Sequence, residues 1–239
     1  MDTEFILIKQ LTMQVDSKTL FDQLEFNIAQ GEAVAIIGAN GAGKTTLLKL
    51  LVGLLQPTMG TLSIAGLQYS NPAADLQLRS LIGFAPDTPP LYPNDTVNSY
   101  LNFVANLKLI PKQQIQARIN NCLDIFELGA VADSYIYTLS KGTQQRINLA
   151  QAVISDPKIL VLDEPTNGLD AAQCRNFSQY LTLLKRQETT LIIASHQYTE
   201  MVEICDYMLR VNNQTIHKIL TPLNSEDIKH TNDQIYYQT

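Results

Sequence analysis

Residues 38–45 read Gly-Ala-Asn-Gly-Ala-Gly-Lys-Thr, a glycine-rich pattern that ends in Lys44 and Thr45. The three glycines allow successive backbone amides to point at phosphate oxygens, and the helix that follows adds the positive end of its dipole. Lys44 offers its charge to the β and γ phosphates, the hydroxyl of Thr45 suits Mg²⁺, and Thr46 is expected to bond near the α phosphate. The pattern predicts these nucleotide contacts: Gly38, Asn40, Gly41, Gly43, Lys44, Thr45 and Thr46.

Two carboxylates, Asp163 and Glu164, follow the apolar run at residues 159–162. They therefore stand at the carboxyl end of a predicted buried strand, the edge at which open α/β sheets bind ligands. We expect Asp163 to hold Mg²⁺ through water and Glu164 to orient or deprotonate the attacking water as general base. His196 follows another apolar run, residues 191–194, and is expected to donate a hydrogen bond to the γ phosphate, with a structural role as the open alternative.

The elements that must position these residues follow from hydrophobic periodicity. Residues 33–37 are an unbroken apolar run, which suits a strand buried on both faces of a parallel sheet. The glycine-rich loop comes next, and then a helix predicted from Thr45 to Val52, with Gly53 and Pro57 as stop signals. This order of strand, loop and helix favours a nucleotide site over a glycine-rich turn that contains Lys-Thr by chance.

Further strands and helices predict an α/β core. Residues 5–28 are expected to form strands, because Leu24, Phe26 and Ile28 alternate with polar residues. Strands are also expected at 159–162 and 191–194 with a helix at about 172–186 between them, an alternation that predicts a parallel sheet with right-handed crossovers. Near the end of the chain, residues 207–211 and 215–219 flank Asn212-Asn213, which suits a hairpin turn.

Residues 88–155 show helical patterns without an obvious strand, which predicts a helical subdomain inserted in the core. Asn94 or Asp95 is expected to cap one helix, and Pro111 opens another. The apolar positions of the first helix are Val97, Tyr100, Leu101, Val104 and Leu107. Those of the second, Ile115, Ile119, Cys122, Leu123 and Phe126, form a stripe that we interpret as packing rather than as a binding face.

Composition excludes several functional classes for these 239 residues. A net charge of −6 and a pI near 5.0 argue against a broad nucleic-acid footprint, which would need a basic surface. No apolar stretch reaches the length of about 18 residues that a membrane span needs, and the N-terminus lacks the order of a signal peptide. Cys122, Cys174 and Cys205 form no C-x-x-C pair and are expected to be small apolar residues in a reducing compartment.

Over about residues 5–220, the motifs resemble those of the nucleotide-binding domain of ATP-binding cassette (ABC) proteins. The resemblance rests first on the glycine-rich residues 38–45, called the phosphate loop below, and on the acidic pair Asp163 and Glu164. It rests also on residues 139–146 (Leu-Ser-Lys-Gly-Thr-Gln-Gln-Arg), the turn at 168–170 (Gly-Leu-Asp) and Ser195-His196. It implies an α/β fold with a P-loop NTPase core, a parallel sheet, an N-terminal antiparallel β portion and an inserted helical subdomain. The expected division is 1–87 and 156–220 for the core, 88–155 for the helical subdomain and 221–239 for a polar tail.

The resemblance also implies a geometry that one chain cannot supply. Two such domains pair head to tail and hold ATP between the phosphate loop of one and the residue 139–146 signature of the other. Ser140 and Gly142 would then contact the γ phosphate across the interface, where a helix N-terminus suits an anion, and Asp170 would link the two sites. Symmetric pairing would be isologous.

Three departures from the family pattern bear on activity. Residues 82–87 resemble the glutamine loop, but Asp87 stands at the glutamine position; it is expected to act on Mg²⁺ and the attacking water with a negative charge. Val15 stands where the family has an aromatic ring stacked on adenine, a loss of about 1 to 3 kcal/mol unless a nearby ring substitutes. Lys141 and Thr143 replace a glycine and a glutamine of the usual signature.

The resemblance implies the ATPase subunit of a membrane ABC transporter with separate transmembrane permease subunits. The Lys141-Gly142 form and residues 91–109 look most like exporter cassettes. A soluble ABC ATPase that acts on ribosomes or DNA, and a regulatory module with little hydrolysis, are the alternatives. The expectation is a cytoplasmic protein on the inner face of the cell membrane, attached through the permease, with ATP and Mg²⁺ as cofactors, no direct nucleic-acid contact, and a homodimer or paired cassette on ATP binding.

Overall fold

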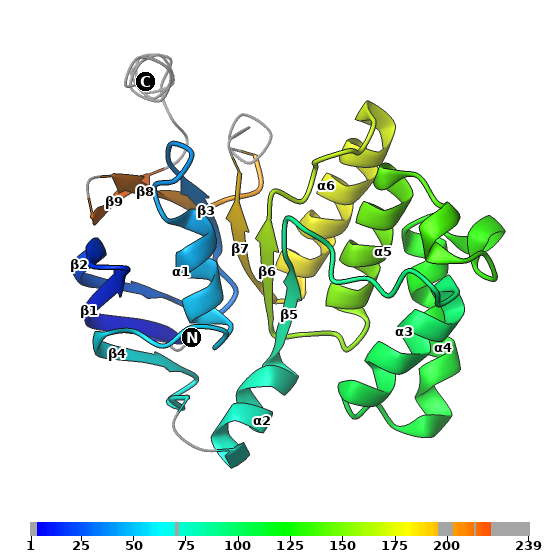
Figure 1. Ribbon diagram of the computed structural model, residues 1–239, viewed down its shortest axis with the longest axis horizontal. Helices are drawn as coiled ribbons and strands as arrows, with labels where there is room; N and C mark the ends of the chain where they lie inside the picture. The colour runs from blue at the N-terminus through cyan, green and yellow to red at the C-terminus, as the bar shows by residue number, and fades with distance from the viewer. Residues whose placement is uncertain (1–3, 70–71, 196–202, 213, 221–239) are drawn as a thin grey trace.

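A computed structural model describes residues 4–69, 72–195, 203–212 and 214–220 (Figure 1). A small antiparallel sheet has the order β2-β1-β4 and consists of β1 (Ile6–Val15), β2 (Lys18–Ile28) and β4 (Met59–Ile64). A larger sheet has the order β5-β6-β7-β3-β8-β9 and consists of β3 (Ala33–Ile37), β5 (Ile82–Ala85), β6 (Ile159–Asp163), β7 (Thr190–Ala194), β8 (Tyr207–Asn212) and β9 (Thr215–Leu220). All of its neighbours pair in parallel except β8 and β9, so the predicted α/β fold with a parallel sheet is confirmed.

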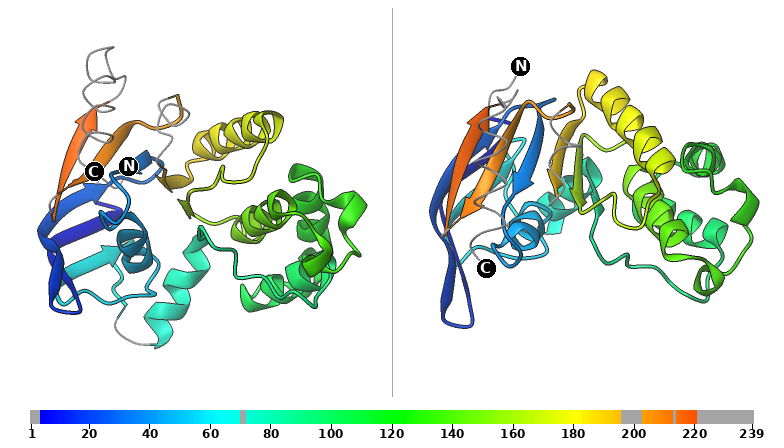
Figure 2. Two further views of the ribbon diagram at one scale, coloured as in Figure 1. Left: turned by 45° about the horizontal axis from the view of Figure 1, so that its top comes forward. Right: turned by 90° about the horizontal axis from the view of Figure 1, so that it is seen from above.

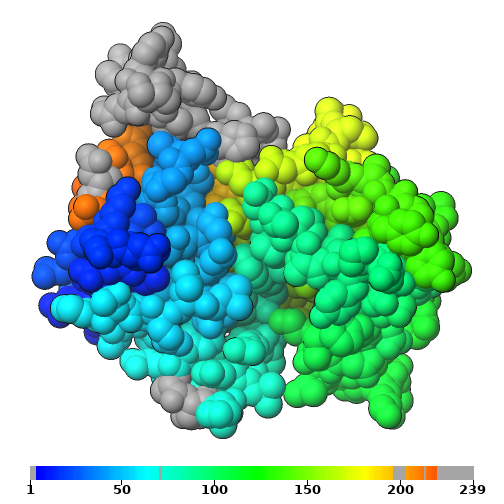
Figure 3. Space-filling model, in the orientation of Figure 1, coloured from blue at the N-terminus to red at the C-terminus, as the bar shows by residue number. Residues whose placement is uncertain are grey.

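The helices lie on two sides of the larger sheet. They are α1 (Lys44–Leu51), α2 (Pro72–Leu81), α3 (Val97–Leu107), α4 (Lys112–Ile125), α5 (Lys141–Val153) and α6 (Ala171–Arg186), with short 3₁₀ turns at Gly129–Val131 and Ile136–Thr138. Helix α1 lies between the two sheets, while α3 to α6 gather on the other side (Figure 2). In the space-filling view α3, α4 and α5 form one continuous green lobe beside the α/β part (Figure 3).

The central strands are buried on both faces, as their unbroken apolar runs predict. In β3, Ala33, Ala35 and Ile37 face the cluster formed with α3 to α6, while Val34 and Ile36 face the cluster formed with α1 and the small sheet. Side chains alternate across a strand, so five apolar residues serve two cores. The sheet is thereby held rigidly where β3 and β6 end, and the residues of the phosphate loop and the acidic pair follow those two strand ends.

The start and end of α3 differ from the prediction. Neither Asn94 nor Asp95 caps the helix; the Oγ1 of Thr96 accepts a hydrogen bond from the Ser99 amide at 3.2 Å. The carbonyl of Asp95 is instead engaged by the amide of Ile136, which fixes the chain before the helix begins. Leu107, expected in the buried stripe, is 62% exposed, whereas the other four predicted positions are buried.

Three elements between residues 59 and 85 were not predicted. Strand β4 is largely exposed on its first half, so it lacks an apolar signature. Helix α2 buries only Leu78, and β5 has only four residues, although the run Ile82-Gly83-Phe84-Ala85 is typical of a short buried strand. The weak signals reflect elements that are stabilised mainly by tertiary contacts.

The remaining local predictions agree with the described structure. Helix α1 begins and ends one residue earlier than expected, and α4 buries its whole apolar stripe and begins after Pro111. Strands β8 and β9 pair antiparallel up to Asn212 and Thr215, as the hairpin predicted, while Asn213 lies outside the described residues. Cys122 and Cys205 are buried, and Cys174 is partly buried. In the described ranges, no helix combines the length and hydropathy needed to cross a bilayer.

Candidate nucleotide site

One pocket collects the phosphate loop, the acidic pair and Asp87. The loop connects β3 to α1, the acidic pair ends β6, and Asp87 follows β5, so three parallel strands deliver their carboxyl ends to the same place. The lining residues are Leu20, Ala39, Asn40, Gly41, Gly43, Lys44, Thr45, Thr46, Asp87, Asp163 and Glu164. The pocket therefore unites segments more than a hundred residues apart in sequence, at the edge where α/β sheets bind ligands.

Lys44 is buried inside the phosphate loop. Its Nζ donates to the Gly38 carbonyl at 2.8 Å and to the Ala39 carbonyl at 3.4 Å. Burial lowers the pKa of Lys44, and the charges of Glu164 and Asp163 act in the opposite direction. The ammonium group is thus held by two weak acceptors that a phosphate can replace with a stronger charge-assisted contact.

The side chains of Thr45 and Asp163 meet directly. The Thr45 hydroxyl donates to Oδ2 of Asp163 at 2.7 Å, and Asp163 is buried. Burial raises the pKa of Asp163, and the hydrogen bond from Thr45 opposes that shift. A hydroxyl and a carboxylate in contact beside a phosphate-binding loop are oxygen donors of the kind that Mg²⁺ prefers, so these residues fit the ion.

Glu164 adopts a left-handed backbone conformation with φ of 48°. Such a conformation is uncommon for a residue other than glycine and persists when its surroundings hold it. Here the Glu164 amide donates to the Ala194 carbonyl at 2.8 Å, and the Asn167 amide donates to the Glu164 carbonyl at 3.2 Å. The chain turns sharply after Asp163, and both neighbouring carboxylates line the pocket.

Asp87 is exposed at the edge of the pocket and has a partner that the sequence did not indicate. The side-chain amide of Asn167 donates to Oδ1 of Asp87 at 3.0 Å. Asn167 lies three residues after Glu164, so this bond joins the segment after β5 to the loop after β6. The two residues are 80 positions apart, so no local pattern in the sequence indicates this bond. The position of Asn167 between Glu164 and the turn at 168–170 was the one hint that its side chain lies near the site.

The signature residues do not line this pocket. Ser140 is exposed and caps α5, where its Oγ accepts from the Thr143 amide at 3.2 Å and lies 2.9 Å from Thr143 Oγ1. A Cβ on Gly142 would stand 2.5 Å from the carbonyl oxygen of Gly168, so the glycine permits a close backbone approach. Thr143 therefore supports the serine, and Gly142 has a packing reason that is independent of any ligand.

Asp170 caps α6. Its Oδ1 accepts from the amides of Ala172 and Gln173 at 2.9 Å, and Gln173 Oε1 accepts from the Asp170 amide, which completes a capping box. This local role explains the aspartate within one chain. His196 lies outside the described residues, whereas Ser195 before it is buried and donates its amide to the Ile36 carbonyl at 3.3 Å.

The position expected to meet the base carries an aliphatic side chain and does not line the pocket. Val15 is 44% exposed, and Leu20 lines the pocket beside the phosphate loop. Phe21 is the nearby ring, but it is fully buried, and a Cβ on Gly43 would stand 2.8 Å from it. Phe21 therefore supports the loop from below and does not replace the missing ring at Val15.

Comparison with known proteins gives a family. The family described as "ABC transporter" matches residues 21–167. The Fe(3+) ions import ATP-binding protein FbpC of Photorhabdus laumondii is 32% identical over 219 residues, which cover 91% of this chain and 62% of that protein. The Nod factor export ATP-binding protein I of Ralstonia nicotianae is 30% identical over 211 residues, which cover 88% of this chain and 65% of that protein.

The fold agrees with solved structures. The dimeric structure of MJ0796, a bacterial ABC transporter cassette, has a TM-score of 0.83 and 22% identity, and covers 92% of this chain and 100% of that chain. This likeness concerns the fold. The chain spans less than two thirds of the length of the two curated relatives above, one named for import and the other for export.

Proposed function

This chain belongs to the ABC transporter family as an ATPase cassette, and we propose that it powers transport through separate transmembrane permease subunits. The observation that carries the proposal is the convergence of Lys44, the Thr45 and Asp163 pair, and Glu164 in one pocket. Lys44 and Thr45 begin α1 after the loop that follows β3, while Asp163 and Glu164 lie at the carboxyl end of β6. Together they offer a phosphate cradle, oxygen ligands for a cation and a base.

Hydrolysis follows from these positions. The loop amides and Lys44 would hold the β and γ phosphates, while Thr45 and Asp163 would hold Mg²⁺. Held there, the ion would supply positive charge that offsets the negative charge developing on the phosphate during transfer. Glu164 would accept a proton from the water whose oxygen attacks the γ phosphorus, as the bond to the bridging oxygen breaks and ADP leaves.

We propose that Asp87 takes the place of a neutral glutamine at the edge of this site. Its bond to Asn167 holds its carboxylate near the loop that carries Glu164. A negative charge there would act on the cation directly or through water. His196 is proposed to donate a hydrogen bond to the γ phosphate.

The cycle we propose needs two copies of the cassette. Ser140 and Lys141 are exposed at the start of α5 and do not line the phosphate pocket of their own chain, so a phosphate would reach this helix N-terminus from another protomer. ATP held between one phosphate loop and the other Ser140 and Gly142 would close the pair, with Asp170 linking the two sites. Hydrolysis would remove that link and reopen it.

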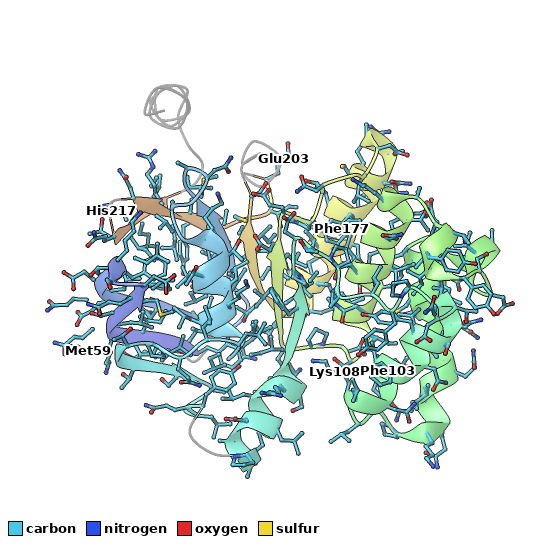
Figure 4. All side chains as sticks on the ribbon, in the orientation of Figure 1. Met59, Phe103, Lys108, Phe177, Glu203 and His217 are labelled. Carbon is cyan, nitrogen blue, oxygen red and sulfur yellow. The ribbon has the colours of Figure 1, made fainter. Side chains whose placement is uncertain are left out.

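The permease would dock on the helical lobe. Tyr92, Phe103 and Leu107 are exposed apolar side chains there, and the rings of Tyr92 and Phe103 lie 5.3 Å apart. Figure 4 places Phe103 on the rim of that lobe. Exposed apolar groups that cluster are typical of a partner site. The cassette would then sit on the inner face of the cell membrane, and we propose export on the basis of the Lys141-Gly142 signature form.

Substitutions in the pocket test the ATPase. Glu164→Gln should abolish turnover yet leave a dimer trapped with ATP, since the amide keeps the shape but cannot take the proton. Lys44→Ala should lose ATP affinity, because the phosphates lose their only buried cation among the described pocket residues. Steady-state phosphate release, equilibrium ATP binding and size-exclusion chromatography with ATP measure the three effects. Turnover of Glu164→Gln at the parental rate contradicts the assigned base.

Membrane extraction tests the partner. We expect the chain to co-purify with a multi-span membrane protein after detergent extraction, and a Phe103→Asp variant to lose it while Gln116→Asp on α4 keeps it. Co-sedimentation with ribosomes, with no membrane partner retained, would instead support the alternative of a soluble ABC ATPase. The net charge of −6 favours the permease.

A further inference from the structure

Three side-chain amides form a buried ladder along one face of α5. Gln145, Asn148 and Gln151 are spaced by three residues, and their exposed fractions are 4%, 0% and 9%. Residues at this spacing share a helix face. The face is turned toward β5 and the loop after β6, and α5 approaches β5 so closely that a Cβ on Gly83 would collide with the Ala152 carbonyl.

The ladder is internally bonded in one direction. Nε2 of Gln151 lies 3.4 Å from Oδ1 of Asn148, and Nδ2 of Asn148 lies 3.3 Å from Oε1 of Gln145. Each amide nitrogen carries two hydrogens. Gln151 and Asn148 each use one hydrogen within the ladder and one on a backbone carbonyl, while Gln145 accepts within the ladder and donates to a backbone carbonyl. A buried amide left unpaired would be costly, and each of the three donates to a backbone carbonyl.

The three backbone acceptors lie in the two segments that carry the pocket carboxylates. Gln151 donates to the Phe84 carbonyl at 2.7 Å, and Asn148 donates to the Pro86 carbonyl at 2.8 Å. Gln145 donates to the Pro165 carbonyl at 3.1 Å. Pro86 immediately precedes Asp87, and Pro165 immediately follows Glu164, so two of the three bonds end one residue from a pocket carboxylate.

Backbone strain at Glu164 gives the Gln145 bond a mechanical role. The left-handed turn is held on its N-terminal side by the bond from the Glu164 amide to Ala194, and by the Asn167 amide on its own carbonyl. Gln145 fixes the next carbonyl, that of Pro165. A strained residue relaxes when such restraints are removed, so losing this bond would let the Glu164 carboxylate move.

We infer that Gln145 and Asn148 are positioning residues for ATP hydrolysis. Through Pro165 and Pro86 they set where Glu164 and Asp87 stand relative to the signature helix, whose first residues would meet the γ phosphate. The inference rests on the proposed roles of Glu164 and of the signature. It assigns two functions to α5. Its N-terminus would bind the γ phosphate held by the other protomer, and its buried face would position the carboxylates of its own chain.

The ladder itself supplies a matched control. Gln145→Met and Gln151→Met both remove an amide while keeping the length of the side chain. Each breaks one bond to a backbone carbonyl and one bond to Asn148. Of these two glutamines, only Gln145 bonds a carbonyl that lies beside a carboxylate, since the Phe84 carbonyl lies within β5. Asn148→Leu, which keeps the volume, is the third variant, and Gln145→Met keeps the test decisive if Asn148→Leu does not fold.

The measurements are kcat, ATP affinity at equilibrium and melting temperature of the full chain. Gln145→Met and Asn148→Leu should lower kcat about tenfold to a hundredfold, as misplaced catalytic groups do, with ATP affinity unchanged. Gln151→Met should lower the melting temperature about as much as Gln145→Met does but keep the parental kcat. A parental kcat in Gln145→Met, or an equal fall in Gln151→Met, overturns the inference.

A double variant separates this inference from the proposed function. If Gln145 acts through Glu164, then Gln145→Met should lower the rate of the parental chain but should not lower any trace of turnover that single-turnover measurement detects in Glu164→Gln, because the group it positions is already disabled. A further fall of the same factor in the double variant overturns the inference. Parental turnover in Glu164→Gln alone refutes the proposed base, whereas a defective Glu164→Gln beside a fully active Gln145→Met refutes only the ladder.

Discussion

Asp163 and Glu164 are neighbours in sequence, yet their backbones give them different surroundings. Asp163 is the last residue of β6 and is buried against Thr45, whereas Glu164 turns into a left-handed conformation and is only partly buried. The first carboxylate therefore suits a cation held beside the phosphate loop, and the second suits contact with water. One strand end supplies both because the chain direction changes between them.

The base side of the pocket allows a prediction of gained affinity. Val15→Tyr should tighten ATP binding by about 1 to 3 kcal/mol, which is roughly 5- to 150-fold, because the exposed position gains a ring on which adenine can stack. Equilibrium binding of ATP measures it. Val15→Leu is the control, since it adds apolar volume without a ring. Equal affinities for the two variants would show that position 15 does not meet the base.

At the scale of elements, α5 is tied to the segment that ends β5 and to the loop between β6 and α6. Ser140 caps it, its buried amide ladder bonds the segments after β5 and β6, and its first turn touches the loop before α6 through Gly142 and Gly168. A helix with so many fixed contacts positions its N-terminus well. The amphipathic signal of its sequence is correspondingly weak, because polar amides occupy its buried face.

The glycine contact gives a stability prediction. Gly142→Ala should destabilise the fold by about 1 to 3 kcal/mol, the usual cost of overpacking, because its Cβ would stand 2.5 Å from the Gly168 carbonyl oxygen. Alanine favours a helix by at most about 1 kcal/mol over glycine, and less in the first turn, so the collision decides the sign. Urea unfolding measures the change.

Gly129→Ala is the matched control for that substitution. A Cβ at Gly129 meets nothing within 4 Å, so this variant should keep the parental free energy of unfolding or gain slightly. If Gly142→Ala were as stable as Gly129→Ala, the close approach of α5 to the loop before α6 would not be a constraint on the fold.

At the scale of the molecule, Lys108 joins the helical lobe to the α/β part. It follows α3, and its Nζ donates to the carbonyls of Arg79 at 2.9 Å and Ile82 at 2.6 Å, at the end of α2 and the start of β5. Figure 4 places it on the side of the lobe nearest α2. The periodicity predicted that Leu107 would be buried, but Leu107 is exposed, and it is Lys108 that reaches the α/β part.

This joint predicts a pH dependence of stability. Burial, with a smaller contribution from Arg79, lowers the pKa of Lys108 from 10.5 to about 8. Between those values the unfolded chain binds a proton that the folded chain does not, so the free energy of unfolding rises with pH through that window. The parental chain should therefore gain stability relative to Lys108→Met as the pH rises from 8 toward 10. A difference that stays constant with pH would contradict a buried charge at this joint.

Several parts of the fold and the site were accessible from the sequence because their signals are local. The phosphate loop, the acidic pair, the buried strands and the stripe of α4 each occupy a short stretch, and their spacing reports periodicity or backbone geometry directly. The N-cap of α3 was harder to predict. Thr96 caps the helix in place of Asn94 or Asp95, because the hydrogen bond from the Ile136 amide to the Asp95 carbonyl fixes the residue before it. Elements with little burial, such as β4 and α2, left no periodic signal.

The sequence by itself determined that a triphosphate cradle and two carboxylates end neighbouring strands, and that an ABC cassette surrounds them. Only the tertiary structure decided which long-range hydrogen bonds form. Asn167 bonds Asp87, the amide ladder bonds the carbonyls of Pro86 and Pro165, and Lys108 bonds the Ile82 carbonyl between the helical lobe and the α/β part. The physical reason is distance along the chain. The sequence pattern around a polar side chain does not indicate which distant group accepts its hydrogen bond. Such a bond forms only after hydrophobic burial has brought the two elements together.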